Sequence, residues 1–271
     1  MSFKSPADIT ATVCTAGCAK IKMNWWKLLI LAFLAGAYIA FGSQLAVTCA
    51  ASIPKEWASL QKLVFGGVFP VGLMLVVIAG SELFTGNCMV PVISCLNKEA
   101  KWSGLFRNWF WVYIGNFIGA LFCAYFLAHL TGLLRVDPWN TYIGNIGVMK
   151  TSLGWGEAFW RGVGCNWLVC LAVWMALSAD DIAGKILAIW WPIMAFVALV
   201  FEHSVANMFF IPASIICTGK VTWGAFFINN LIPVTLGNIV GGAFFVGTLY
   251  WWVYIRVKAP AAKPISTPDS K

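Results

Sequence analysis

Two short polar clusters interrupt otherwise apolar stretches of this sequence, and one of them contains a histidine. The first cluster is ELFTGN at residues 82–87, and the second is EHSVAN at residues 202–207. A neutral imidazole at His203 could donate a hydrogen bond to an anion, whereas a protonated one could attract an anion or pass it a proton. The simpler alternative is a histidine that hydrogen-bonds two helices together. The position of His203 in a repeated polar cluster favours a functional role.

The elements around these clusters are membrane helices. Of the 271 residues, 61% are hydrophobic and 10% are charged, with a mean hydropathy of +0.82, which lies outside the range of water-soluble domains. A membrane-spanning helix needs about 20 apolar residues. Stretches of this kind lie at about residues 25–48, 61–96, 105–132, 157–178, 186–216 and 223–256. We therefore predict an all-α polytopic membrane protein with six transmembrane helices.

The second and fifth stretches are too long for one straight crossing, so we expect both helices to be interrupted at their polar clusters. The clusters recur at an offset of 120 residues, and GNFIG at 115–119 recurs as GNIVG at 237–241, at an offset of 122. These matches predict a three-helix repeat, over about residues 25–132 and 157–256. Three crossings invert the second copy, as in water and glycerol channels, and place the site near the bilayer midplane.

The direction of the interrupted helices determines which charge the site prefers. In this topology, the half-helix after each interruption begins near the middle of the membrane. Its start carries free N–H groups and the positive end of the helix dipole. Thr85 and Ser204 lie where a helix cap or a ligand-facing hydroxyl would be. Two positive helix ends at one cavity favour an anion over a cation.

The carboxylates of the two clusters, Glu82 and Glu202, would repel anions if they lined the pore. We therefore expect both side chains to face away from the pore. They would accept hydrogen bonds from backbone N–H groups that the interruptions free. Four asparagines are expected to share this structural role: Asn87, Asn207, Asn116 and Asn238.

The basic residues indicate the topology. Twelve of the 18 Lys and Arg residues would lie on the side of the two termini and six on the other, which predicts cytoplasmic N and C termini. We expect a cytoplasmic N-terminal segment at 1–24, a transmembrane channel domain at 25–256 and a cytoplasmic tail at 257–271. No cleaved signal peptide is apparent. The net charge of +8 reflects orientation and contact with anionic membrane lipid rather than binding of nucleic acid.

The remaining reactive side chains do not suggest an enzyme. The nine cysteines lack the spacing of metal ligands and are expected to pack as small apolar residues. His203 and the few other polar residues form no hydrolytic triad or metal site. We therefore predict no catalytic activity, no metal and no cofactor.

Four separated motifs resemble the formate/nitrite transporter family. They are VIAGSELFTG at 77–86, GVGCNWLVCLA at 162–172, FLAGAYIAFG at 33–42 and FEHSVANM at 201–208. The resemblance covers about residues 3–256. It implies a homopentamer in the plasma (inner) membrane of a prokaryote, in which each protomer has an aquaporin-like fold and its own pore.

The resemblance also assigns roles to individual residues. It implies an apolar constriction of Phe69, Leu73 and Phe196, with Leu83, Phe84 and Val169 near a second one. Between the constrictions, Thr85 and His203 would contact the anion, helped by Asn166. Lys150, which we expect in the long outer loop, would attract anions at the vestibule.

Members of this family carry formate, nitrite, hydrosulfide or lactate. The opening SFKSPADI and the general pattern are most similar to formate channels, so we expect formate to be the substrate, with proton coupling through His203. Nitrite and hydrosulfide remain alternatives. A water or neutral-solute channel is a weaker one, because the Asn-Pro-Ala boxes of such channels are missing: Asn87 is followed by Cys88, and Asn207 by Met208.

Overall fold

The computed structural model describes residues 3–257, and this part of the chain is helical apart from turns and one isolated bridge. The all-α class predicted from the sequence is confirmed. The α-helices are α1 (Pro6–Lys22), α2 (Trp25–Ala50), α3 (Ala58–Val68), α4 (Val71–Ile78), α5 (Phe84–Asn87), α6 (Val90–Leu96), α7 (Trp102–Phe122), α8 (Trp139–Thr151), α9 (Trp155–Ser178), α10 (Ile182–Ala198), α11 (Ser204–Thr218), α12 (Trp223–Ala225), α13 (Ile232–Val240) and α14 (Leu249–Trp251). Short 3-10 or π-helical segments adjoin them at Lys55–Trp57, Cys123–His129, Phe226–Leu231, Gly241–Thr248 and Trp252–Arg256. The predicted tail lies, apart from Val257, outside the described residues.

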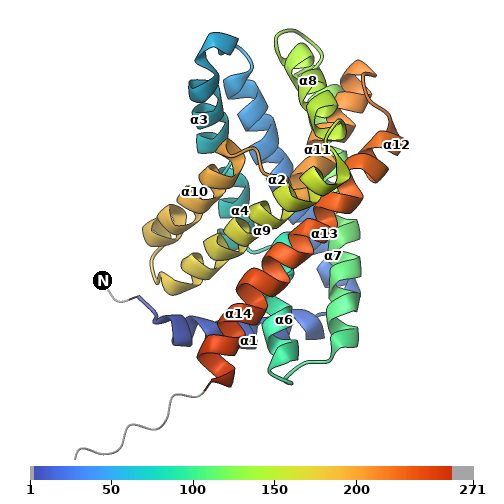
Figure 1. Ribbon diagram of the computed structural model, residues 1–271. Coiled ribbons are helices and arrows are strands. Elements are labelled where there is room, and N and C mark those ends of the chain that lie inside the picture. The colour runs from blue at the N-terminus through green and yellow to red at the C-terminus, as the bar shows by residue number, and fades with distance from the viewer. Residues whose placement is uncertain (1–2, 258–271) are drawn as a thin grey trace, which may run out of the picture.

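Figure 1 shows the helices as one bundle, with α3 and α8 at one end and α1 across the other. Within residues 3–257, five helical spans are long and apolar enough to cross a membrane: Trp25–Ala50, Lys55–Ile78, Trp102–His129, Trp155–Ser178 and Trp223–Arg256. The span Lys55–Ile78 is followed by the shorter helical segment Phe84–Leu96. The fifth apolar stretch consists of α10 and α11, each shorter than a full crossing. The structure therefore contains both interruptions that the sequence predicts.

Close helix contacts recur in the two halves of the chain. The helix α2 packs along α7, and α9 packs along α13. A Cβ on Gly119 would collide with the carbonyl oxygen of Phe33, and a Cβ on Gly241 would collide with that of Val163. Glycine therefore lets these helix backbones approach closely. Both glycines belong to the repeated Gly-Asn motifs, so each motif brings an asparagine close to an interruption.

The N-terminal helix α1 packs against α6 and α9. The hydroxyl of Ser94 donates to the carbonyl oxygen of Cys14 at 2.6 Å. The backbone N–H of Lys4 donates to the carbonyl oxygen of Ser178 at 3.1 Å. The segment expected at 1–24 therefore contains a helix that is held against the bundle.

Candidate functional site

Both interruptions contain a residue in the left-handed region of backbone conformation. Gly80 has a φ of 82°, and Val200, 120 positions later, has a φ of 58°. This conformation is easy for glycine and strained for a β-branched residue. Arg161 holds the second interruption in two ways. Its guanidinium donates to the carbonyl oxygen of Val200 at 3.4 Å, and its own carbonyl oxygen accepts the N–H of Glu202 at 3.2 Å.

One asparagine fixes the extended residues of the first interruption. The Oδ1 atom of Asn116 accepts the N–H of Phe84 at 2.8 Å, where α5 begins. Its Nδ2 atom donates to the carbonyl oxygens of Glu82 at 2.9 Å and Ala32 at 2.8 Å. One buried side chain therefore satisfies an N–H group and a carbonyl group that the broken helix leaves without helical partners.

Asn238 makes the same three contacts at the second interruption. Its Oδ1 atom accepts the N–H of Ser204 at 2.9 Å. Its Nδ2 atom donates to the carbonyl oxygens of Glu202 at 3.0 Å and Gly162 at 2.8 Å. The structural role predicted for Asn116 and Asn238 therefore agrees with their contacts.

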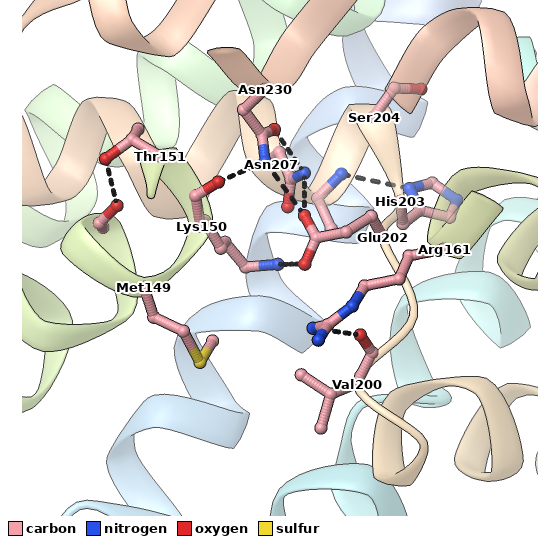
Figure 2. Close-up of polar contacts among 12 residues, drawn as sticks. Met149, Lys150, Thr151, Arg161, Val200, Glu202, His203, Ser204, Asn207 and Asn230 are labelled. Atoms are coloured by element: carbon pink, nitrogen blue, oxygen red, sulfur yellow. Dashed lines mark hydrogen bonds and ion pairs between the residues drawn. The ribbon is translucent and has the colours of Figure 1, made fainter. Parts of the chain in front are cut away.

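Glu202 accepts hydrogen bonds from three side chains in a buried network that Figure 2 shows. The Nζ atom of Lys150 lies 2.8 Å from Oε1. Asn207 and Asn230 donate to Oε2 at 2.7 and 3.1 Å. Asn207 also donates to Asn230 at 2.7 Å, and Asn230 donates to the carbonyl oxygen of Lys150 at 2.9 Å. The side chain of Glu202 is 0% exposed, so its charge is balanced inside the protein.

The first half contains a matching network around Glu82. Lys20 of α1 lies 2.6 Å from Oε1, and Asn87 donates to Oε2 at 2.7 Å. Asn87 also donates to Asn108 at 2.9 Å, and Asn108 donates to the carbonyl oxygen of Lys20 at 3.3 Å. The side chain of Lys20 is 23% exposed, against 10% for Lys150. The N-terminal helix thus supplies the cation that α8 supplies in the other half.

Two expectations from the sequence were wrong here. The carboxylates accept hydrogen bonds from lysine and asparagine side chains rather than from freed backbone N–H groups, because the asparagines of α7 and α13 take the N–H groups at the helix starts. Lys150 does not lie in a loop. It lies in the last turn of α8 and is 8% exposed, because Glu202 pairs with it in the interior.

His203 and Thr85 bring the two interruptions together. The Nε2 atom of His203 lies 3.1 Å from the Oγ1 atom of Thr85, and both residues are buried. The Nδ1 atom of His203 accepts the N–H of Ala206 at 3.1 Å and so caps α11. Because Nδ1 is an acceptor, the proton of the neutral ring lies on Nε2. His203 therefore presents an N–H donor to Thr85, whose hydroxyl proton is free to donate elsewhere.

The two halves of the repeat differ in sequence at the positions of His203 and Thr85. At the offset of 120, His203 corresponds to Leu83, and Thr85 corresponds to Val205. Each half therefore supplies one polar residue where the other half has an apolar one. The Oγ atom of Ser204 is buried and has no hydrogen-bond partner among the described residues, so of the two roles expected for this hydroxyl, helix cap and ligand-facing group, it does not fill the first.

Two cavities approach the site from opposite interruptions. The first, of about 340 Å³, is lined by Lys150, Asn207 and His203, and we call it the Lys150 cavity. The second, of about 400 Å³, is lined by Lys20, Glu82 and Asn87, and we call it the Lys20 cavity. Glu202 does not line the Lys150 cavity, whereas Glu82 lines the Lys20 cavity. The expectation that both carboxylates face away from such a path therefore fails for Glu82.

Four of the six predicted constriction residues line these cavities. Phe69 and Phe196 line the Lys150 cavity and form an edge-to-face pair with ring centroids 5.8 Å apart. The Phe196 ring also stacks on His203, with centroids 5.8 Å apart. Leu73, one turn after Phe69, lines the Lys20 cavity together with Leu83. Large apolar side chains therefore occupy the boundary between the cavities.

Four further predicted residues, Thr85 among them, line neither cavity. Phe84 packs edge-on against Tyr113 and Trp109 of α7, with ring centroids 4.8 and 6.0 Å away. Val169 of α9 is buried. Asn166 donates to the carbonyl oxygens of Thr85 at 3.1 Å and Asn238 at 2.6 Å. Asn166 thus holds the backbone of Thr85 in place.

Sequence reasoning missed several members of the two networks. The split of basic residues does not distinguish Lys20 from the other eleven expected on the side of the termini, and the predicted structural asparagines do not include Asn108 and Asn230. A signal for the two asparagines exists, because they are 122 residues apart, as are Asn116 and Asn238. Lys20 and Lys150 are 130 apart, so no common offset reveals this pair. The described residues hold no cluster of His, Cys, Asp and Glu that could bind a metal ion.

Comparisons with known proteins agree with this geometry. The family model described as formate/nitrite transporter matches residues 7–252. The chain is 57% identical to a probable formate transporter of Methanothermobacter thermautotrophicus, covering 94% of this chain and 98% of that relative. It is 34% identical to the nitrite transporter NirC of Salmonella typhimurium, covering 96% and 97%. A solved pentameric formate channel with formate bound is similar with a TM-score of 0.73 and 35% identity, covering 85% of this chain and 97% of that one.

Proposed function

Because the chain belongs to the formate/nitrite transporter family, we propose that it is a membrane channel or transporter for formate. The observation that carries the proposal is the contact between His203 Nε2 and Thr85 Oγ1. It places a ring N–H donor that lines the Lys150 cavity beside a buried hydroxyl with a free proton. A carboxylate with two adjacent oxygens matches two neighbouring donors. The relatives named for formate support this substrate.

Formate first meets a lysine on either side of the site. Lys150 and Lys20 each line a cavity and each pair with a glutamate. An ammonium group has three donors, and the glutamate accepts one of them, so donors remain for an anion in the cavity. The glutamate holds the ammonium group in place through a charge-assisted hydrogen bond. The lysines thereby replace part of the water that formate loses as it enters.

At the centre, formate would replace the hydrogen bond between His203 and Thr85, and both side chains would donate to the anion instead. The anion would accept the Nε2–H of His203 and the hydroxyl proton of Thr85. Asn166 holds the Thr85 carbonyl, and the cap on Ala206 holds the ring, so the donors are fixed before formate arrives. Donors positioned in advance lose little freedom on binding.

The rings of Phe69 and Phe196 make passage of a bare anion costly, since an unpaired charge is strongly disfavoured in an apolar surrounding. Protonation to formic acid removes most of that cost. The Nδ1 atom of His203 is used in the cap, so the ring cannot accept a second proton there without losing this bond. The proton therefore reaches formate from bulk solution, relayed by water in a cavity, and His203 acts as the hydrogen-bond donor that holds the anion during the transfer.

The assembly and orientation form part of the same proposal. The chain would be a homopentamer with one pore in each protomer, and its similarity to the solved pentameric formate channel supports this assembly. It would lie in the inner membrane of a prokaryote with both termini in the cytoplasm, and its basic residues support this orientation. Residues 1–24 and 257–271 would be cytoplasmic and residues 25–256 the transmembrane domain. The Lys20 cavity would then open inward and the Lys150 cavity outward.

Flux in proteoliposomes tests the substrate. Purified protein is reconstituted, and uptake of formate, nitrite, hydrosulfide and glycerol is followed separately at pH 5.5 and 7.5. We expect formate to enter fastest, with faster uptake at the lower pH and no glycerol-dependent volume change beyond that of empty liposomes. Formate uptake equal to that of empty liposomes would overturn the proposal.

Nitrite is the second candidate, because the chain is also similar to a nitrite transporter. Nitrite is also a small monovalent anion with two oxygens that can accept from both donors. The same assay separates the candidates, since the ratio of nitrite to formate uptake is measured in one preparation. A ratio well above one would assign nitrite as the preferred substrate.

A further inference from the structure

The two cavities differ in their balance of charge. The Lys150 cavity is lined by two cationic side chains, Lys62 of α3 and Lys150 of α8. Lys150 is buried and paired with Glu202 at 2.8 Å. Lys62 is exposed, and it makes no ion pair with any described residue. A residue that is exposed and also lines a cavity lies at the opening of that cavity.

The Lys20 cavity has no such cation. Among the described residues, Lys20 is the only lysine or arginine that lines it, and Lys20 pairs with Glu82 at 2.6 Å. Its formal charge is therefore balanced, whereas the Lys150 cavity carries one unbalanced positive charge at its opening. The symmetric networks that hold the two interruptions do not produce this difference, because Lys62 belongs to neither.

We propose that Lys62 captures anions at the opening of the Lys150 cavity and that this capture acts from one side of the membrane only. The inference rests on the proposed function. Lys150, whose charge Glu202 balances, acts at short range by donating hydrogen bonds. Lys62, whose charge is unbalanced, raises the local concentration of anions before they enter.

The size of the effect follows from Coulomb's law. One unit charge about 7 Å from a monovalent anion in water changes the local anion concentration about threefold at low ionic strength. Reversing the charge changes it about sevenfold by the same relation. Added salt reduces the effect, because the screening length is about 10 Å at 0.1 M and about 3 Å at 1 M.

The test uses right-side-out and inside-out membrane vesicles that contain the full chain. Lys62→Gln, Lys62→Glu and Lys62→Arg are compared with wild type by the KM and maximal rate of formate uptake. The matched control is Lys55→Glu. Lys55 is also exposed and unpaired among the described residues, but it lines neither cavity. It lies seven residues before Lys62, about 10 Å along a helical segment.

At low ionic strength, we expect the KM to rise about threefold for Lys62→Gln and about sevenfold for Lys62→Glu, with the maximal rate unchanged. Lys62→Arg should keep the wild-type KM, and Lys55→Glu should change it by about twofold or less. The effects should appear in one vesicle orientation only and disappear in about 0.5 M salt.

The outcomes separate this inference from the proposed function. Wild-type vesicles that conduct formate, with the same KM for Lys62→Glu and Lys55→Glu, would overturn the capture role alone. Equal effects in both vesicle orientations would overturn its one-sided action. Wild-type vesicles without formate uptake would overturn the proposed function itself.

Discussion

The Nε2 atom of His203 lies 3.1 Å from the Oγ1 atom of Thr85, although 118 residues separate them in the chain. Each residue comes from a different interruption, and each stands where the other half of the chain has an apolar side chain. The contact is possible because two matching networks hold the interruptions in place. The site is therefore asymmetric, although the two networks that hold it are nearly symmetric.

The first prediction separates the two roles of His203. His203→Asn keeps an N-cap residue, because asparagine is a preferred cap, but its side chain is shorter than the imidazole ring. Thermal stability should stay close to that of wild type. Formate flux should fall about tenfold or more, since a hydrogen bond to a charged group contributes about 1.5–3 kcal/mol. His203→Leu, which introduces the residue found at position 83, should also lose about 0.5–2 kcal/mol of stability with the cap. Wild-type flux in the asparagine variant would contradict the donor role.

The second prediction concerns the buried pair of Lys150 and Glu202. Glu202→Gln leaves an ammonium group in the interior without its counter-charge, so we expect a loss of about 3–5 kcal/mol, seen as a lower melting temperature in detergent. Replacing the lysine as well, in Lys150→Met with Glu202→Gln, should recover most of this loss.

The matching change in the other network, Glu82→Gln, serves as the control. Lys20 is 23% exposed and can reach water when its partner is neutral, so the loss should be smaller. Equal losses of stability for Glu82→Gln and Glu202→Gln would show that exposure of the lysine does not determine how much stability is lost when its partner is neutralised.

The third prediction concerns a close approach of helices. Gly119→Ala places a methyl group against the carbonyl oxygen of Phe33, and the helices must separate to accept it. We expect destabilisation of about 1–3 kcal/mol. Gly67→Ala is the control, because a Cβ there would have no heavy atom within 4 Å apart from the backbone of its own helix and its chain neighbours. It should stabilise α3 by about 0.5–1 kcal/mol, since alanine favours a helix. A Gly119→Ala variant with the same melting temperature as the wild type would contradict the close packing of α2 and α7.

The fourth prediction is the pH dependence of Cys14 in the N-terminal helix. Burial, together with a hydrogen bond to the Glu99 carboxylate, raises the pKa of the Cys14 thiol to about 11. The reactive thiolate is therefore rare at neutral pH. Below that pKa, its fraction grows about tenfold for each unit by which the pH rises. Mass spectrometry after maleimide treatment at pH 7.5 should find the exposed Cys49 labelled and Cys14 unlabelled, with Cys14 labelling rising toward pH 10. Equal labelling of both at pH 7.5 would show that α1 leaves the bundle.

The helical membrane class, the two interruptions and His203 followed from the sequence, because they depend on local patterns. A long apolar stretch indicates a membrane crossing, and a polar cluster within such a stretch indicates an interruption of the helix, whatever the surrounding structure is. The offset of 120 residues paired Glu82 with Glu202, since matching residues of a repeat keep their spacing.

The partners of these residues required the tertiary structure. The sequence places Lys150 near the middle of the chain and Lys20 near its beginning, and nothing local shows that each pairs with a buried glutamate. Only the fold brings α8 and α1 to the two interruptions. Because a charge can enter the interior only beside its partner, packing decided that Lys150 is a balanced, buried group. It also decided that Lys62, which showed no distinguishing pattern in the sequence, stands unpaired at the cavity opening.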